Sequence, residues 1–258
     1  MRREAGVVVA LGRRALSVQF RRAQLLMPTF VLPLMLLAVI ASGTSAAQDL
    51  RGFPDVGSYL AFVVPGTLIQ GALLAGLTSG IAFAGDIEFG FFDRLLAAPV
   101  RRSSLILGRQ AGTIGLSLLQ SVFFLGVAAL AGAHFEGSPL ALLAAVGLAA
   151  ITAVGLGGVA SAIAIRTGSL SLLQSIFPFM FVLLFTAPAF FPRDLLAPAL
   201  HDVAAYNPLT YVVEAVRGLL TGDASAGGAG AGLAAAVGMA VAATALATFA
   251  LRERLRTL

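Results

Sequence analysis

Side chains able to carry covalent or metal chemistry are scarce in this chain of 258 residues. It contains no cysteine, and all 17 basic residues are arginine. These absences exclude a cysteine nucleophile, a cysteine metal site, a lysine Schiff base and the lysine-dependent P-loop that holds nucleotide phosphates. The two histidines, His134 and His201, are too far apart for an H-E-x-x-H zinc site. We expect no catalytic residue, no metal and no cofactor bound by this chain, and hence no enzyme.

The composition indicates lipid as the main solvent. Hydrophobic residues make up 59% of the chain and charged residues 11%, against about 25% in soluble domains. A net charge of +5 and a pI near 10.9 would also suit a nucleic-acid-binding protein. In a membrane chain, however, arginine collects in cytoplasmic loops near anionic lipid. We therefore expect membrane lipids as partners and no nucleic acid.

Six uncharged runs are each long enough to cross about 30 Å of hydrocarbon as a helix. They comprise residues 23–48, 56–85, 110–135, 137–165, 167–192 and 224–251. The fifth run contains Pro178, Pro188 and Pro192, which suggests a crossing followed by a bent exit. The predicted fold is an all-α polytopic membrane protein, with one domain over residues 1–258 and six transmembrane helices.

The distribution of arginine predicts the orientation. Fourteen arginines lie before the first run, after the second and fourth runs, or at the C-terminus, and three lie in the other connections. The positive-inside rule then places both termini in the cytoplasm. We expect a multi-pass protein of the plasma (bacterial inner) membrane. Ser45-Ala46-Ala47 resembles a signal-peptide cleavage site, but the preceding regions are longer than usual, so we expect an uncleaved first span.

Two segments outside the runs are amphipathic. Residues 1–22 place arginines on one arc of a helical wheel and aliphatic residues on most of the rest, which predicts a cytoplasmic interfacial helix. The alternative is a solvated basic tail. In residues 193–223, Asn207 supplies an N-cap and Pro208 a first helical residue for a short external or re-entrant helix. Its apolar stripe faces away from a polar stripe in which Glu214 and Arg217 form an i, i+3 pair.

The loop at residues 86–109 is too long and too aromatic for a simple connection. It mixes charges with exposed apolar residues, which favours a docking surface for a partner over mere seating on lipid. Asp93 to Leu96 can form a short helix that ends before Pro99.

Polar residues within the runs mark any substrate path only weakly. The candidates are Gln70, Gln120, Gln174 and Ser175. The alternative is that each makes a hydrogen bond between helices. Two glycine pairs, Gly76 with Gly80 and Gly108 with Gly112, have the small-xxx-small spacing of closely packed membrane helices.

Two motifs resemble the ABC-2 type exporter permeases. GDIEFGFFDRLLAAPVRRSSLILGR is similar to the cytoplasmic loop of that family through Glu88, Leu95, Leu96, Pro99, Val100, Arg102, Gly108 and Arg109. NPLTYVVEAVRGLLTG resembles the stretch before the last span of the family through Asn207, Pro208, Glu214, Arg217 and Gly218. The order of elements also matches, and the closest group is the daunorubicin-resistance-like permeases.

The resemblance implies the membrane subunit of an ATP-binding-cassette exporter, acting as a dimer, most simply a homodimer. A separate ATPase subunit would bind ATP and Mg²⁺ and dock on the loop. The implied coupling residues are Glu88, Asp93, Arg94, Leu95, Leu96, Pro99 and Arg102. The cargo would be a hydrophobic or amphipathic drug, lipid or glycolipid, moved outward.

The alternative function is an ion-coupled secondary transporter. That class usually carries carboxylates or broken helices at the membrane midplane. None of the six runs contains Asp or Glu, and the halves of the chain show no convincing repeat. An intramembrane enzyme is disfavoured in the same way, because the runs hold no catalytic cluster.

Overall fold

The computed structural model describes residues 2–21, 23–43, 59–97 and 102–256, and all regular structure in them is helical. The helices are α1 (Arg2–Arg21), α2 (Ala23–Gly43), α3 (Tyr59–Glu88), α4 (Phe91–Ala97), α5 (Arg102–Leu130), α6 (Pro139–Thr167), α7 (Leu170–Phe185), the 3-10 turn η2 (Arg193–Leu195), α8 (Pro198–Tyr206), α9 (Pro208–Thr221) and α10 (Ala226–Arg254). The predicted all-α polytopic class is confirmed.

Helices α3, α5, α6 and α10 are long and apolar enough to cross a membrane. Each has 29 or 30 residues, which is about 44 Å at 1.5 Å per residue. Helices α1 and α2 form a pair bent by 72°, which counts as a fifth candidate if it is one broken span. Helix α7 has 16 residues, about 24 Å, and is shorter than the hydrocarbon layer. Six crossings therefore stay a prediction.

The long helices extend further than the uncharged runs. Helix α3 ends at Glu88 and α5 begins at Arg102, so most of the loop predicted at residues 86–109 is helical. Between them lies α4, close to where the sequence predicted a short helix. Pro99 lies outside the described residues. Helix α7 is followed by a turn at 186–192, consistent with a bent exit.

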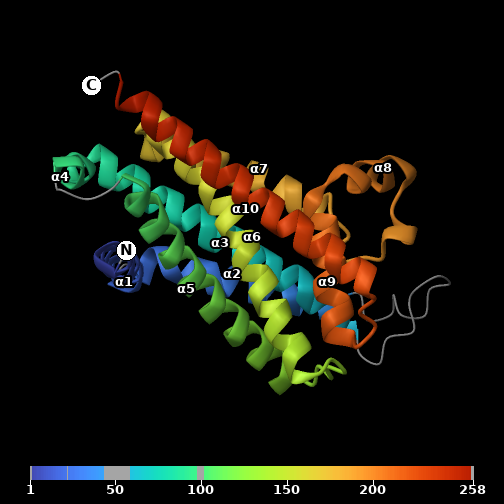
Figure 1. Cartoon of the computed structure of the whole chain (residues 1–258). Coiled ribbons are helices and arrows are strands. Elements are labelled where there is room, and N and C mark those ends of the chain that lie inside the picture. Colours follow the sequence, from blue (N-terminus) through green and yellow to red (C-terminus); the bar gives the residue numbers. More distant parts are fainter. Residues whose placement is uncertain (1, 22, 44–58, 98–101, 257–258) are drawn as a thin grey trace.

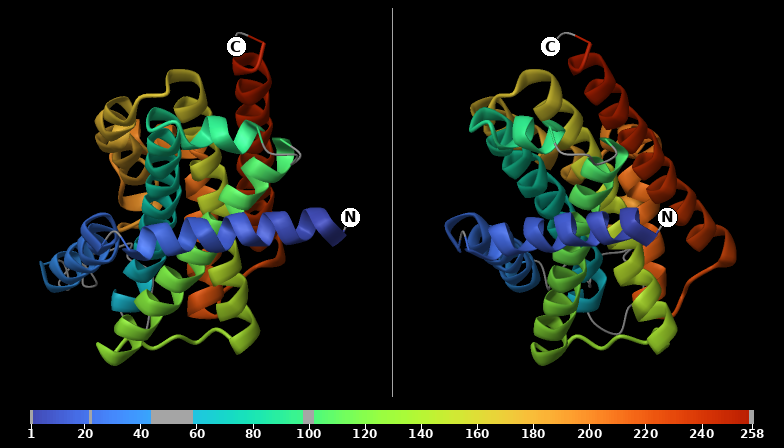
Figure 2. Two further views of the ribbon diagram at one scale, coloured as in Figure 1. Left: turned by 90° about the vertical axis from the view of Figure 1, so that its left-hand side faces the viewer. Right: turned by 60° about the vertical axis from the view of Figure 1, so that its left-hand side comes forward.

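The bundle has two distinct ends (Figure 1). Helix α4, the start of α1 and the end of α10 lie at one end, which we call the arginine-rich end. Helices α8 and α9 lie at the other end, called the far end. Helix α1 crosses the long helices at a steep angle, as the two rotated views make clear (Figure 2).

Helix α3 is the centre of the bundle. It packs against α2, α5, α6, α7 and α9. Its side chains are buried on every side; Phe62, Leu68, Ile69 and Leu73 are at most 1% exposed. A helix that is apolar all round is suited to this central position.

Small residues let the long helices approach closely. A Cβ atom at Gly76 of α3 would lie 2.6 Å from the amide nitrogen of Gly157 of α6, and one at Gly80 would lie 2.4 Å from Ala160 Cβ. Gly108 and Gly112 of α5 instead pack against α1, where they contact Leu11 and Ala15 respectively. Both glycine pairs predicted from the sequence therefore lie at helix contacts.

Substituting Gly76 should loosen the contact between α3 and α6. Gly76→Ala places a methyl group against backbone atoms, which cannot move as a flexible side chain would. We expect the free energy of unfolding to fall by about 1–3 kcal/mol, as is typical of an overpacked core. The measurement is the midpoint of thermal unfolding in detergent, which should be lower. Gly147→Ala on α6 is the control, because no atom lies within 4 Å of its added Cβ. Equal midpoints for both variants would contradict this packing.

Candidate functional site

The deepest contact of helix α4 with the bundle is the aromatic side chain of Phe92. Phe92 is fully buried and meets the ring of Phe83 edge-on, with the ring centroids 5.3 Å apart. It joins an apolar cluster with Leu105 and Ile106 of α5. The turn from α3 into α4 uses Gly90, whose φ of 70° is in the region that glycine adopts most readily. Helix α4 thus turns away from α3 without leaving the bundle.

The other face of α4 is open. Asp93 and Arg94 are exposed, and Phe89 in the preceding turn is 74% exposed. Leu95 and Leu96 are half-buried and pack at the edge of the apolar cluster. We call Phe89, Asp93 and Arg94 the α4 surface. An exposed aromatic side chain beside exposed charges is a composition favoured at protein interfaces.

A polar cluster beneath α4 joins three helices. Asp86 of α3 accepts hydrogen bonds from Arg14 of α1, at 3.4 Å, and from Arg109 of α5. The Arg14 guanidinium also lies over the ring of Phe91 in α4, 3.7 Å from its centroid. We call Arg14, Asp86, Phe91 and Arg109 the Asp86 cluster. It fixes α1, α3, α4 and α5 relative to one another.

Sequence reasoning did not select the Asp86 cluster as a site. Asp86 marks one end of the predicted loop, Arg109 marks the other end and belongs to the loop motif, and Arg14 is one of several arginines in the predicted interfacial helix. The one available signal was that an acid and an arginine flank the aromatic segment. Nothing in the sequence showed that α1 would return to the same point.

Neutralising Asp86 should destabilise the α4 end of the bundle. The Asp86 and Arg109 side chains are 17% and 11% exposed, so Asp86→Asn would leave a largely buried guanidinium without its counterion. We expect the free energy of unfolding to fall by about 2 kcal/mol. This is below the roughly 3–5 kcal/mol lost when a fully buried ion pair is broken, because part of the cluster reaches solvent. Protease sensitivity near α4 would measure it. Arg166 and Glu253 form a comparable ion pair, but both are half-exposed. Glu253→Gln should have little effect, and an equal effect would contradict a special role for Asp86.

Two other predicted coupling residues have different positions. Glu88 ends α3, and its carboxylate accepts a hydrogen bond from the backbone nitrogen of Leu170 at 3.0 Å. It therefore satisfies a free amide at the N-terminus of α7. Arg102 begins α5. Glu88 thus connects α3 to α7 and lies off the α4 surface.

The far end is organised by Asn207 and Arg217. Asn207 caps α9, accepting from the Leu209 amide at 2.9 Å, and its side-chain amide donates to the Leu183 carbonyl at 2.7 Å. Pro208 is the first residue of α9. The predicted cap and first-turn proline are confirmed. Because the Asn207 side chain also binds the end of α7, it joins two elements.

Arg217 lies deeper than its polar stripe suggested. Its guanidinium donates to the carbonyl oxygens of Phe62, Pro188 and Ala189, at 3.3, 2.6 and 3.2 Å, and lies 4.0 Å from the centroid of the Phe62 ring. Pro188 and Ala189 belong to the turn after α7, whose carbonyls lack helical partners. Burial lowers the pKa of Arg217 to about 10, while Glu214 acts in the opposite direction. Arg217 therefore stays charged at neutral pH.

Glu214 is half-buried on α9, within electrostatic reach of Arg217 and of Arg193 in η2. Burial raises the pKa of its carboxyl group, while Arg193 and Arg217 pull that pKa down. The apolar side of α9, which the sequence predicted as one stripe, packs inside the protein, and Leu209, Val212, Val213, Val216 and Leu220 are all inaccessible. The far end is consequently a packed cap on the bundle.

The polar residues proposed for a substrate path differ in their surroundings. Gln120 of α5 donates to the hydroxyl and carbonyl oxygens of Thr29 of α2, at 2.9 and 3.2 Å. It thus makes the helix-to-helix hydrogen bond that was the alternative interpretation. Gln70 is fully buried in α3 and has no hydrogen-bond partner among the described residues. Gln174 and Ser175 are exposed on α7.

Comparison with known proteins identifies the family of this chain. A sequence family described as ABC-2 type transporter matches residues 7–221, from α1 through α9. This chain belongs to the ABC-2 type transporter family. It is therefore a multi-pass membrane permease.

Named relatives carry a matching description. The chain is 30% identical to "Putative transport permease ycf38" of Porphyra purpurea over 212 residues, 81% of this chain and 72% of the relative. The protein of that name from Pyropia yezoensis gives the same identity and coverage. The one from Cyanophora paradoxa is 26% identical over 209 residues, 79% of this chain and 71% of the relative.

Proposed function

We propose that this permease is the membrane subunit of an ATP-binding-cassette exporter, driven by a separate ATPase subunit that docks on the α4 surface. The observation that carries the proposal is the construction of α4. One side is fixed by the buried ring of Phe92, and the other presents Phe89, Asp93 and Arg94 to a partner. ATP and Mg²⁺ would bind the partner, because this chain has no P-loop lysine.

The Asp86 cluster would transmit movement of the ATPase to the bundle. A force on α4 acts on Phe91 and Phe92, which contact Arg14 and Phe83. Those contacts reach α1 and α3, and Asp86 extends them to α5. Alternating access requires two packed arrangements of the helices, with nucleotide favouring one of them. The cluster supplies the rigid connection that such a change needs.

The proposed orientation places the arginine-rich end in the cytoplasm and the far end outside the plasma (bacterial inner) membrane. Both chain ends then lie in the cytoplasm, since the start of α1 and the end of α10 are at the same end of the bundle as α4 (Figure 1). A homodimer is part of the proposal. Phe179, Val182 and Phe185 form an exposed apolar face on the short helix α7, suited to a second copy.

The proposed cargo is a hydrophobic or amphipathic molecule such as a drug, a lipid or a glycolipid. The buried surfaces of the long helices are aliphatic and aromatic, and their polar groups are neutral amides and hydroxyls apart from the clusters at the two ends. Such surfaces suit apolar molecules better than ions. Assignment to the daunorubicin-resistance-like group is part of this proposal.

The direct test is reconstitution with the ATPase subunit that co-purifies with this chain. We expect ATP hydrolysis by the complex to rise with the correct cargo, and cargo transport to require ATP. The second candidate, an ion-coupled transporter, would move cargo in proteoliposomes of this chain alone, driven by an ion gradient. Transport without nucleotide would overturn the proposal in favour of that candidate.

A further inference from the structure

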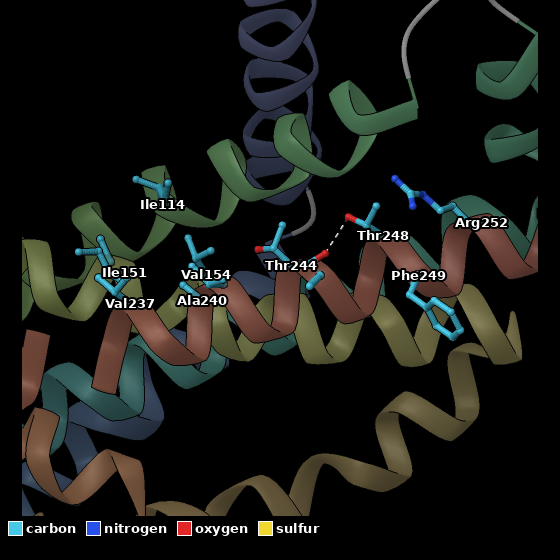
Figure 3. A pocket seen from close by; sticks show the side chains of 12 residues that line it. Ile114, Ile151, Val154, Val237, Ala240, Thr244, Thr248, Phe249 and Arg252 are labelled. Carbon is cyan, nitrogen blue, oxygen red and sulfur yellow. Dashed lines mark hydrogen bonds between the residues drawn. The ribbon is translucent and has the colours of Figure 1, made fainter. Parts of the chain in front are cut away.

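An apolar groove of about 730 Å³ runs along the outer side of α10 (Figure 3). Its walls come from α5, α6 and α10, and include Ile114, Ile151, Val154, Val241, Phe249 and Arg252. The volume lies within the range of about 300–1,000 Å³ typical of ligand sites. The docking and far-end sites use other residues, so this groove has no part in the function proposed above.

The polar side chains of the groove lie in the half nearer the arginine-rich end. The Thr248 hydroxyl already donates to the Thr244 carbonyl within α10, at 2.8 Å. Arg252 is exposed at the arginine-rich end and makes no ion pair with any described residue. Its neighbours are engaged, since Glu253 pairs with Arg166 and Arg254 donates to the Ile165 carbonyl. The groove is therefore a hydrocarbon trough with one uncompensated cation at its end.

The dimensions match one leaflet of a bilayer. From Val237 to Arg252 the groove follows 16 residues of α10, a rise of about 22 Å at 1.5 Å per residue. One leaflet contributes about 15 Å of hydrocarbon, or about 20–22 Å together with its polar headgroup region. Arg252 would then lie at the level of the phosphates while the aliphatic walls extend through the leaflet.

We propose that this groove binds an anionic phospholipid of the leaflet at the arginine-rich end. One acyl chain lies in the trough, and the phosphate contacts Arg252. A basic residue at the membrane surface attracts anionic lipid by about 1 kcal/mol, equivalent to about a fivefold preference over a zwitterionic lipid.

A second copy of the chain fits the groove less well. A two-fold axis normal to the membrane keeps equivalent residues at the same depth, so pairing groove to groove would bring two Arg252 side chains together. Two concave apolar surfaces would also leave empty space between them. A flexible acyl chain avoids both costs.

The absence of tryptophan from the chain permits a clean experiment. Phe249→Trp places one fluorophore in the groove, and Leu246→Trp places one on α10 outside the groove lining. Each variant is placed in bilayers with brominated phosphatidylglycerol or brominated phosphatidylcholine, which quench nearby tryptophan. At Phe249→Trp we expect brominated phosphatidylglycerol to reach half-maximal quenching at a mole fraction about fivefold lower than brominated phosphatidylcholine needs. At Leu246→Trp the two lipids should quench equally.

Arg252→Gln in the Phe249→Trp background is the decisive variant. It keeps the groove and removes the charge, so quenching should remain but lose its preference for phosphatidylglycerol. Equal quenching by the two lipids at Phe249→Trp, or a preference that survives Arg252→Gln, would overturn the proposal. The same preference at Leu246→Trp would also overturn it, because it would indicate general enrichment of phosphatidylglycerol around the protein. No quenching at Phe249→Trp would overturn it as well, because the groove would then be closed by protein.

Discussion

Reversing the charge of Arg94 should reduce association of this permease with its ATPase subunit at least tenfold. Arg94 is exposed on α4 and makes no hydrogen bond or ion pair with another described residue, so Arg94→Glu should leave the fold intact. At an interface it replaces a favourable charge contact by a repulsive one, and such changes commonly cost 2 kcal/mol or more, about a thirtyfold change in affinity. The measurement is the amount of ATPase that co-purifies at equal permease expression.

Two further variants separate docking from folding. Arg256→Glu makes the same charge reversal at the same end of the bundle but away from α4, and should leave association unchanged. Leu95→Pro should break α4, because proline removes a helical hydrogen bond and clashes with the preceding turn. Its association should be lost while membrane insertion continues. Normal association of both α4 variants would show that the ATPase docks elsewhere.

Replacing Arg217 should destabilise the far end and abolish transport. Arg217→Leu removes hydrogen bonds to three carbonyl oxygens, including those of Pro188 and Ala189 in the turn after α7. Hydrogen bonds to charged groups contribute about 1.5–3 kcal/mol each, and buried acceptors left unpaired add a penalty. Allowing for water reaching the turn, we expect a loss on the order of 3 kcal/mol in unfolding free energy. Thermal unfolding of the purified permease measures it.

Glu214 provides the matched control on the same helix. It is half-buried, and burial already raises the pKa of its carboxyl group. Glu214→Gln keeps the shape of the side chain and removes only its charge, so it should cost less stability than Arg217→Leu, which removes three hydrogen bonds. Transport by Glu214→Gln then reports on the charge alone. If Arg217→Leu unfolds no earlier than Glu214→Gln, the carbonyl contacts are not what holds the turn.

Local features of the fold followed from the sequence. The Asn207-Pro208 pair determines where α9 begins, because the cap and the fixed proline backbone act within one turn. The α4 helix was also predictable from local signals, because Pro99 disfavours a helical residue before it and so limits where the helix can end. The Gly76 and Gly80 contacts were visible as a spacing, although the partner, α6, was not. Hydropathy located the long helices but not their ends. Helix α3 continues beyond its uncharged run to Glu88, and α5 begins before its run, at Arg102.

The two end clusters could not be predicted because they depend on distant segments. Asp86 binds Arg14, 72 residues away in sequence, and this pairing exists only because α1 packs across Gly108 and Gly112. Arg217 was expected on a polar stripe because periodicity compares residues within one helix. Its partners are carbonyls of a non-helical turn, which a pattern of side chains does not reveal. Tertiary packing thus decided both clusters.

The central claim is that the α4 surface contacts an ATPase on the cytoplasmic side. Because the chain has no cysteine, Phe89→Cys provides a single labelling site at a position that is 74% exposed. The measurement is reaction with a membrane-impermeant maleimide in intact cells, in inside-out vesicles and in inside-out vesicles with bound ATPase subunit. The account predicts no reaction in cells, full reaction in vesicles and protection by the ATPase. Labelling in intact cells, or no protection by the bound subunit, would contradict it.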